Sequence, residues 1–237
     1  MVSVLRAAKP DLIINPAAYT AVDRAESEAE AAMAVNATAP GVIAEEAKRL
    51  GAGLIHFSTD YVFDGEKAGP YDEADAPNPL NAYGRSKLEG ERAVAQSGAR
   101  HLILRTSWVY SRRGKNFLLT MLELAKTRPE LRIVDDQRGA PTSARALADA
   151  VAQIARRDWP SGTFHLTCSG ATTWFGFARA IFELSPGPRP SLVAITTPEF
   201  PTPARRPKNS VLSNAKATQA FGITLPDWQA ALAQTLS

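Results

Sequence analysis

The stretch Leu54 to Asp60, LIHFSTD, decides the fold class, because an apolar run ends there in two small hydroxyls and a carboxylate. Bulky and β-branched residues without polar alternation predict a strand buried on both faces, as in a parallel sheet. Two further runs have this character, Leu12 to Asn15 (LIIN) and His101 to Thr106 (HLILRT). We therefore expect three parallel strands, with polar side chains at the carboxyl edge of the sheet.

Segments that favour helices lie between these strands. Asp23 to Leu50 is rich in Ala and Glu, and we expect Asp23 to cap it, a break near Ala39-Pro40-Gly41 and an end at Gly51. Tyr83 to Gln96 is a second predicted helix. The alternation of strands and helices predicts an α/β fold with a Rossmann-like, doubly wound parallel sheet.

The pattern changes after Ser107, where helical segments outnumber strands. We expect helices at 116–126, 143–156, 174–184 (with Thr173 as N-cap) and 227–236, strands at 131–134 and 163–167, and a Pro-rich loop at 186–207. The predicted organisation is a Rossmann-like cofactor domain over residues 1–140, joined by part of 143–166, and a smaller substrate-binding portion from 107–137 and 170–237.

Composition bounds the class of protein. The chain has 237 residues, is 45% hydrophobic and 22% charged, and carries a formal net charge of +3, as an ordinary soluble globular protein would. The absence of a basic block of five or more residues argues against nucleic-acid binding and leaves acidic small substrates open. Without an 18-residue apolar run or a signal peptide, we expect no membrane segment and a cytoplasmic location.

Cysteine and histidine usage bounds the metal chemistry. The single cysteine, Cys168, excludes an intrachain disulfide and a Cys-based zinc site. The three histidines, His56, His101 and His165, are scattered in apolar runs, so we expect them to pack in or beside strands. We predict no metal ligands.

A tyrosine and a lysine lie four residues apart in NAYGRSKLEGER, Asn81 to Arg92. This spacing places Tyr83 and Lys87 on one helical face. A neighbouring ammonium favours the phenolate and would lower the tyrosine pKa toward neutrality, as a group that exchanges protons at pH 7 requires. The same spacing is also typical of a solvated helix face, so the pair needs support from other segments.

Two segments give that support. After the strand that ends at Ser58, the Thr59 hydroxyl could hydrogen-bond a substrate carbonyl oxygen while Tyr83 delivers a proton, although small polar residues there are also ordinary turn chemistry. In INPAAYTAVDRAE, Ile14 to Glu26, the small Ala17 and Ala18 let backbone approach a flat ligand, although a plain strand-to-helix turn is equally compatible.

Taken together, the chain resembles the dTDP-4-dehydrorhamnose reductase family of extended short-chain dehydrogenase/reductases. The resemblance runs in order over essentially the whole chain, and the Ser-Thr-Asp-Tyr-Val-Phe and Asp-Gln-x-Gly-x-Pro-Thr segments separate this family from other sugar-nucleotide enzymes. The matching segments are Asn15–Glu26, Asn36, Ser58–Gly65, Tyr83–Lys87, Arg105–Tyr110, Asn116-Phe117, Asp136–Thr142 and Arg206-Pro207.

The resemblance implies a reaction and its residues. Hydride from NADPH or NADH would reduce the 4-keto group of a dTDP-sugar, dTDP-6-deoxy-L-lyxo-4-hexulose, to give dTDP-L-rhamnose for polysaccharide biosynthesis. Thr59, Tyr83 and Lys87 match the family's catalytic triad, in which Tyr83 protonates the developing alkoxide, Lys87 lowers its pKa and holds the nicotinamide ribose, and Thr59 hydrogen-bonds the oxygen.

The resemblance also implies contact residues. Cofactor contacts would come from Ala18, Tyr19, Thr20, Phe57, Tyr83 and Lys87, and substrate contacts from Thr59, Asp60, Trp108 and Arg206. The indole face of Trp108 would be available to stack on the sugar. Arg205 and Arg206 would lie near the nucleotide-sugar phosphates, with a solvated loop as the alternative.

One departure from the family pattern concerns its opening Gly-rich turn, whose glycines let backbone amides approach the pyrophosphate. None of the fifteen glycines precedes Gly41, and only eleven residues stand before the first predicted strand. We expect that strand to match the fourth of the family's sheet, with about 45 residues missing before it. A start at an internal methionine, a truncated product, and a chain that works without this part are the three explanations.

This departure bears on cofactor binding and on the sheet edge. We expect the 237-residue chain to bind NADPH weakly, its preference between NADH and NADPH to be undetermined, and Leu12 to Asn15 to form an exposed edge. Two other functions stay open: a non-catalytic regulatory or binding subunit like that of methionine adenosyltransferase, and a sugar-nucleotide epimerase. Mg²⁺ and a homodimer are suggested by the resemblance alone.

Overall fold

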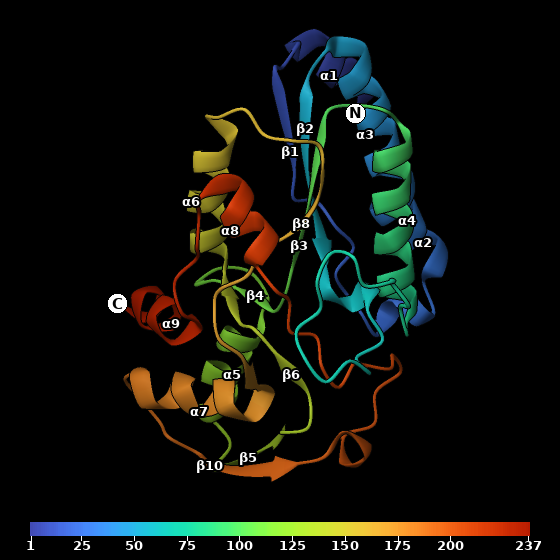
Figure 1. Ribbon diagram of the computed structural model, residues 1–237. Helices are drawn as coiled ribbons and strands as arrows, with labels where there is room; N and C mark the ends of the chain where they lie inside the picture. The colour runs from blue at the N-terminus through green and yellow to red at the C-terminus, as the bar shows by residue number, and fades with distance from the viewer.

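The computed structural model describes residues 1–237 and centres on a parallel sheet of four strands. The strands follow the order β1-β2-β3-β8, and their carboxyl ends point toward the smaller lower part of the molecule (Figure 1). They are β1 (Leu12–Asn15), β2 (Gly53–Thr59), β3 (His101–Thr106) and β8 (Gly162–His165). The three strands predicted first are confirmed, and the predicted strand at 163–167 begins one residue earlier and ends at His165.

Helices cover both faces of the sheet, which confirms the doubly wound α/β prediction. α3 (Ala39–Leu50) and α4 (Ala82–Gln96) lie on one face, and α6 (Ala144–Ala155) and α8 (Ala215–Phe221) lie on the other (Figure 1). None of the helices combines the length and the apolarity that crossing a bilayer requires.

The alternation of side chains along the strands explains why both faces need cover. Leu54 and Ile103 are buried in a cluster with Ala44 of α3, whereas Ile55 and Leu104 belong to the opposite cluster with residues of α6. Successive strand residues point to opposite faces, so an uninterrupted apolar strand is stable only when helices cover both.

The segment predicted to be helical over 23–50, with a break near Ala39-Pro40-Gly41, is divided earlier than predicted, while the predicted end at Gly51 is confirmed. It forms the 3-10 turn η1 (Arg24–Glu26), α2 (Ala29–Met33), the π-helical turn η2 (Ala34–Thr38) and then α3, so the break precedes Pro40. The Asp23 side chain accepts no capping hydrogen bond from the start of this segment. Its carboxylate instead accepts hydrogen bonds from Arg206.

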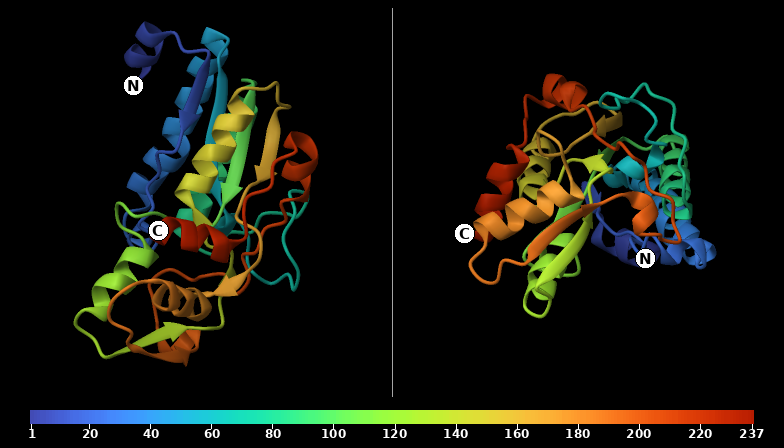
Figure 2. Two further views of the ribbon diagram at one scale, coloured as in Figure 1. Left: turned by 90° about the vertical axis from the view of Figure 1, so that its left-hand side faces the viewer. Right: turned by 90° about the horizontal axis from the view of Figure 1, so that it is seen from below.

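The smaller part is built on two parallel strands, β5 (Glu130–Val134) and β10 (Ser191–Ile195), packed under α5 (Phe117–Ala125) and α7 (Trp174–Leu184) (Figure 2). β10 lies inside the segment predicted as a Pro-rich loop, which corrects that prediction.

Side chains of Asn116, Thr173 and Asp227 accept backbone N–H groups at the starts of α5, α7 and α9 (Trp228–Leu236). Elements missed from the sequence are α1 (Val2–Ala8), α8, and the two-residue strands β4 (Val109–Tyr110), β6 (Arg138–Gly139), β7 (Thr142–Ser143) and β9 (Thr172–Thr173).

The two parts share one apolar core. The largest buried cluster runs from Leu102 and Leu104 in the sheet through Tyr110 to Leu118 and Phe177 in the smaller part. Apolar contact therefore fixes the smaller part below the carboxyl edge of the sheet, where open α/β folds place their binding sites.

Two glycines let α4 seat closely on its neighbours. A Cβ at Gly84 would collide with the carbonyl oxygen of Tyr61, and a Cβ at Gly90 would collide with that of Asn36. In both cases the obstacle is backbone, which cannot rotate away as a side chain would. The position of α4 against the 3-10 turn at Asp60–Val62 and against η2 therefore requires glycine at these two sites.

Replacing Gly90 with Ala should lower the free energy of unfolding by about 1–3 kcal/mol, because the added methyl group overpacks α4 against Asn36. Urea denaturation of both proteins measures the change. Gly69→Ala is the matched control, since no atom lies within 4 Å of its Cβ position. Equal stabilities for the two variants would show that α4 is not seated as described.

Candidate active site

Thr59 is the last residue of β2 and begins the turn that forms the site. Its side chain accepts the Tyr61 N–H at 3.1 Å, which caps the 3-10 turn η3 (Asp60–Val62), and it donates to Asp60 Oδ1 at 2.9 Å. Both Thr59 and Asp60 are buried. The strand-to-turn junction thus fixes a hydroxyl and a carboxyl side by side at the carboxyl edge of the sheet.

The carboxyl group of Asp60 is removed from solvent. Its Oδ2 atom is buried without a hydrogen-bond partner. Burial raises the pKa of Asp60 to about 7, and the hydrogen bond from Thr59 only partly opposes this shift. Asp60 is therefore an acid whose proton is exchangeable near neutral pH.

Tyr83 lies in the first turn of α4. Asn81 caps that turn by accepting the Gly84 N–H at 2.8 Å, and the Tyr83 ring meets the Tyr61 ring edge-on with centroids 5.9 Å apart. Burial raises the pKa of Tyr83 to about 12, opposed by the Thr59 hydroxyl. Our expectation that Lys87 lowers this pKa toward neutrality is wrong for this structure, because desolvation outweighs the other influences on the phenol.

Lys87 lies one turn further along α4 and is 1% exposed. Its Nζ donates to the carbonyl oxygen of Phe57 at 2.6 Å and lies 3.4 Å from His56 Nε2. Burial lowers the pKa of Lys87 to about 8, and the charge of Glu91 opposes this shift. The amine is thus directed at β2 and makes no hydrogen bond with the phenol.

A buried ion pair anchors α4 to the sheet. Glu91 accepts hydrogen bonds from Arg105 of β3 at 2.9 and 2.7 Å and from Ser58 Oγ of β2 at 2.5 Å. All three residues are buried. Ser58 precedes Thr59 in β2, and Glu91 follows Lys87 by one turn of α4. The ion pair therefore connects the strand that carries Thr59 with the helix that carries Lys87. Sequence reasoning assigned no role to this pair.

The expected cofactor segment lies next to Tyr83. Asn36, in the π-helical turn, accepts the Tyr19 N–H at 2.8 Å and donates to the Tyr19 carbonyl at 3.0 Å and to Ser86 Oγ at 2.9 Å. Tyr19 and Tyr83 pack against the same small apolar cluster. The structure thereby brings the Ala18–Thr20 segment to the start of α4. Asn36 was missed as a positioning residue, although a polar residue within an Ala-rich helix was a signal for it.

Trp108 is sandwiched, so its indole face is not free as we expected. Its ring stacks on Trp174 with centroids 3.5 Å apart and 4° between the planes. A Cβ on Gly139 would fall directly against Cε2, 2.6 Å from Nε1 and 2.7 Å from Cζ2. These near-equal distances place Gly139 over the ring rather than at its edge, on the face opposite Trp174. Trp108 also has a left-handed backbone, with φ of +48°.

Arg206 is engaged within the protein. Its guanidinium donates to both carboxylate oxygens of Asp23, at 3.0 and 2.8 Å, and to the hydroxyl of Thr202. It also lies beside Tyr61, whose ring packs on Tyr83. The arginine therefore closes one side of the site through an ion pair. The backbone carbonyl of Arg205 accepts a hydrogen bond from Asn81 at 2.8 Å.

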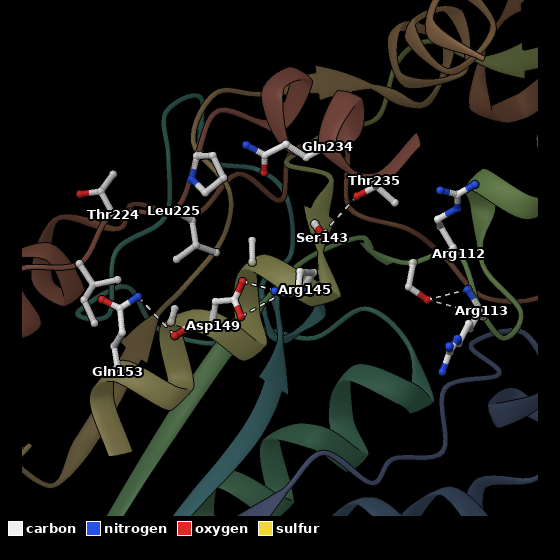
Figure 3. Close-up of a pocket in the computed structure, with 15 residues that line it drawn as sticks. Arg112, Arg113, Ser143, Arg145, Asp149, Gln153, Thr224, Leu225, Gln234 and Thr235 are labelled. Carbon is white, nitrogen blue, oxygen red and sulfur yellow. Dashed lines mark hydrogen bonds and ion pairs between the residues drawn. The ribbon is translucent and has the colours of Figure 1, made fainter. Parts of the chain in front are cut away.

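The three histidines lie in strands of the four-stranded sheet. His56 and His165 are fully buried in β2 and β8, and His101 is partly buried, which confirms their predicted packing. A cavity of about 780 Å³ lies between α6, α9 and the loop after β4 (Figure 3). None of the predicted site residues lines it, and Arg145 there is bonded to Asp149. The structure contains no cluster of three or more His, Cys, Asp or Glu side chains that could hold a metal ion.

Asp60→Asn should change how stability depends on pH. The folded-state pKa of about 7 lies above the ordinary value of 3.8, so the unfolded chain loses its proton first, and stability falls as pH rises from about 4 to 7. Asparagine removes this loss, so the variant should gain stability relative to the parent across that window, by at most about 4 kcal/mol. Urea denaturation at several pH values measures the difference.

The matched control is Asp158→Asn, because the Asp158 side chain is fully exposed. It should leave the pH profile of stability unchanged. A difference between Asp60→Asn and the parent that stays constant with pH would contradict a proton held on Asp60.

Comparison with known proteins shows the family of this chain. The profile described as RmlD substrate binding domain matches residues 1–237. The dTDP-4-dehydrorhamnose reductases of Burkholderia thailandensis and Escherichia coli K12 are 52% and 48% identical, over 97% and 98% of this chain and 82% and 81% of theirs. A crystal structure of dTDP-4-dehydrorhamnose reductase from Bacillus anthracis, in complex with NADP, superimposes with a TM-score of 0.94 at 36% identity, covering 99% of this chain and 83% of that one. The chain therefore belongs to the dTDP-4-dehydrorhamnose reductase family, with its Rossmann-like extended short-chain dehydrogenase/reductase fold.

Proposed function

We propose that this chain performs its family's reaction, the reduction of dTDP-4-dehydro-L-rhamnose to dTDP-L-rhamnose with NADPH or NADH. The observation that carries the proposal is the gathering of Thr59, Tyr83 and Lys87 at the carboxyl edge of the sheet. The 52% identity to a reductase over nearly the whole chain supports the same reaction.

Tyr83 is suited to be the proton donor. With a pKa raised to about 12, its phenol keeps its proton at neutral pH and can donate it to the oxygen of a ketone as that oxygen becomes an alkoxide. Thr59, whose hydroxyl lies close enough to influence this pKa, would donate a hydrogen bond to the same oxygen. With a pKa of about 8, Lys87 is mostly charged at pH 7. Its charge would reduce, without outweighing, the cost of burying the phenolate left behind.

The described residues fit the reactive end of a nicotinamide cofactor. The exposed Ala17 and half-buried Ala18 offer little side-chain bulk beside Tyr83, and Asn36 fixes the backbone that follows them. Thr20, Phe57 and the buried amine of Lys87 are the other contacts we assign to this end. A bound NADPH or NADH supplies the hydride.

We assign the substrate to the opposite side of the site. Asp60, which is protonated below about pH 7, would hydrogen-bond a sugar hydroxyl. Trp108 would contribute the edge of its indole, since both faces are covered, and Arg206 would act through its ion pair with Asp23. In this assignment the part around the four-stranded sheet holds the cofactor, and residues 107–137 and 170–237 hold the dTDP-sugar. A homodimer stays a prediction.

Tyr83→Phe should reduce kcat by at least about 100-fold, because it removes only the proton-donating hydroxyl. The test follows NADPH oxidation with the 4-keto dTDP-sugar, and measures sugar binding separately, which should change little. Tyr110→Phe is the matched control, because Tyr110 is buried and its hydroxyl has no hydrogen-bond partner. It should keep the parent's kcat.

The same assay separates the alternatives. A reductase consumes one NADPH per sugar, whereas an epimerase regenerates its cofactor and shows no net consumption. A folded parent protein that binds NADPH yet turns over no sugar would favour a non-catalytic binding role. Equal kcat values for Tyr83→Phe and the parent would contradict the proposed role of Tyr83.

A further inference from the structure

A buried chain of polar groups leads from the end of β1 to Lys87. The Ala17 N–H donates to Asn15 Oδ1 at 3.2 Å, Asn15 Nδ2 lies 3.1 Å from His56 Nδ1, and His56 Nε2 lies 3.4 Å from Lys87 Nζ. The side chains of Asn15, His56 and Lys87 are 6%, 0% and 1% exposed. Buried polar groups of this kind have defined donor and acceptor roles, because no solvent can replace a mismatched partner.

The backbone determines those roles. Because the Ala17 N–H is a donor, it holds the carbonyl oxygen of the Asn15 amide, and the NH₂ group of Asn15 then faces His56. An NH₂ group donates, so His56 Nδ1 must be the bare acceptor. Burial lowers the pKa of His56 to about 3, and the nearby Lys87 adds to this shift, while a hydrogen bond with the Asn15 backbone only partly opposes it, so the ring is neutral. Its single proton is therefore on Nε2 and faces Lys87.

An N–H group directed at an amine interacts favourably with the neutral amine and unfavourably with the ammonium. The lone pair of neutral Lys87 can accept the hydrogen bond from Nε2–H, whereas an ammonium in the same place presents its own hydrogens to it. Both states can donate to the Phe57 carbonyl at 2.6 Å. His56 in this tautomer thus favours the neutral amine.

Other ionisable groups near Lys87 also affect whether its amine is charged. On α4 itself, Glu91 favours the ammonium, but its carboxylate is paired with Arg105 of β3. Asp60 of η3 is protonated below about pH 7 and Tyr83 is neutral. At the start of α4, Glu26 of η1 accepts the Ala82 N–H.

The remaining elements packed against α4 add no unpaired charge at this point. The turn η2 (Ala34–Thr38) has no ionisable side chain. In α3, Glu46 is bonded to Arg6. In α2, Glu30 is exposed. The imidazole of His56 is accordingly the group in direct contact with Nζ that opposes its charge.

We propose that Asn15 and His56 are positioning residues that hold Lys87 poised between its ammonium and neutral amine states, through a His56 tautomer set by the Ala17 N–H. Its catalytic consequence rests on the proposed function: an amine that titrates close to the working pH can adjust its charge beside the Tyr83 phenol. The arrangement itself is a property of the folded chain, and it is measurable without substrate.

The first test reads the tautomer in the unmodified protein. Long-range ¹H–¹⁵N NMR spectra of ¹⁵N-histidine-labelled protein distinguish a bare ring nitrogen from a protonated one, and the signal missing in His56→Gln assigns His56. We expect a bare Nδ1 and a protonated Nε2 from pH 6 to 9. A proton on Nδ1, or a charged ring in this range, would overturn the proposal.

The second test inverts the tautomer. In Asn15→Asp, one carboxylate oxygen still accepts the Ala17 N–H and the other accepts from His56 Nδ1–H, so the bare Nε2 would then stabilise the ammonium. The titration midpoint of Lys87, followed by NMR of ¹³C-lysine-labelled protein and assigned with Lys87→Met, should rise by about one pH unit. A midpoint that stays or falls would contradict the proposal.

The control separates the tautomer from the added charge. In a His56→Leu background the carboxylate is still present but no imidazole connects it to Lys87, so Asn15→Asp should leave the midpoint unchanged. A rise of the same size there would show that charge alone acts, and would overturn the proposal. If a variant does not fold, the NMR measurement of the His56 tautomer in the unmodified protein tests the proposal by itself. Absence of reductase turnover would contradict the proposed function, but it would not affect the measured tautomer of His56 or the titration midpoint of Lys87.

Discussion

The buried ion pair between Arg105 and Glu91 is the interaction on which the arrangement of the site depends. It links the third strand of the sheet to the middle of α4, and Ser58 brings the end of β2 into the same network. Removing one partner of a buried pair leaves an uncompensated charge, which typically costs about 3–5 kcal/mol. Tyr83 lies two turns before Glu91 and Lys87 lies one turn before it, so both side chains that we propose as catalytic take their positions from this anchor.

Burial then sets the chemistry of the anchored groups. Desolvation raises the pKa of Asp60 to about 7 and lowers that of Lys87 to about 8, which brings a carboxylic acid and an amine close to neutral pH. It raises that of Tyr83 to about 12, so the phenol remains a proton donor. One physical cause thus prepares three groups for different roles, because each responds according to the sign of its charged form.

The sequence predicted features that depend on local pattern. Continuous apolar strands, the cap at Thr173 and the position of Thr59 at the end of a strand were readable, because their signals lie within a few neighbouring residues. The helices near Asn116 and Asp227 were also predicted, but without these residues as their caps. The role of Asp23 was not readable. It resembles a helix cap, yet it pairs with Arg206, which is 183 residues away.

The contacts made by the candidate site residues were harder to predict from the sequence than the list of candidate residues. Helical spacing placed Tyr83 and Lys87 on one face, but the acceptor for the amine is the Phe57 carbonyl on another element. Likewise, an aromatic residue such as Trp108 suggests a stacking surface, and only the fold reveals that Trp174 and Gly139 already cover it. Similarity to known proteins identifies the family of the chain. The positions of these side chains depend on how segments distant in the sequence pack together.

The most direct measurement of the central claim is a double-mutant cycle on Glu91→Gln and Arg105→Met, with unfolding free energies from urea denaturation. If the pair anchors α4, the two changes should be strongly non-additive, with a coupling energy of at least about 2 kcal/mol, because the second change removes the charge stranded by the first. Additivity within about 0.5 kcal/mol would contradict the claim, since α4 would then keep its seat without the pair.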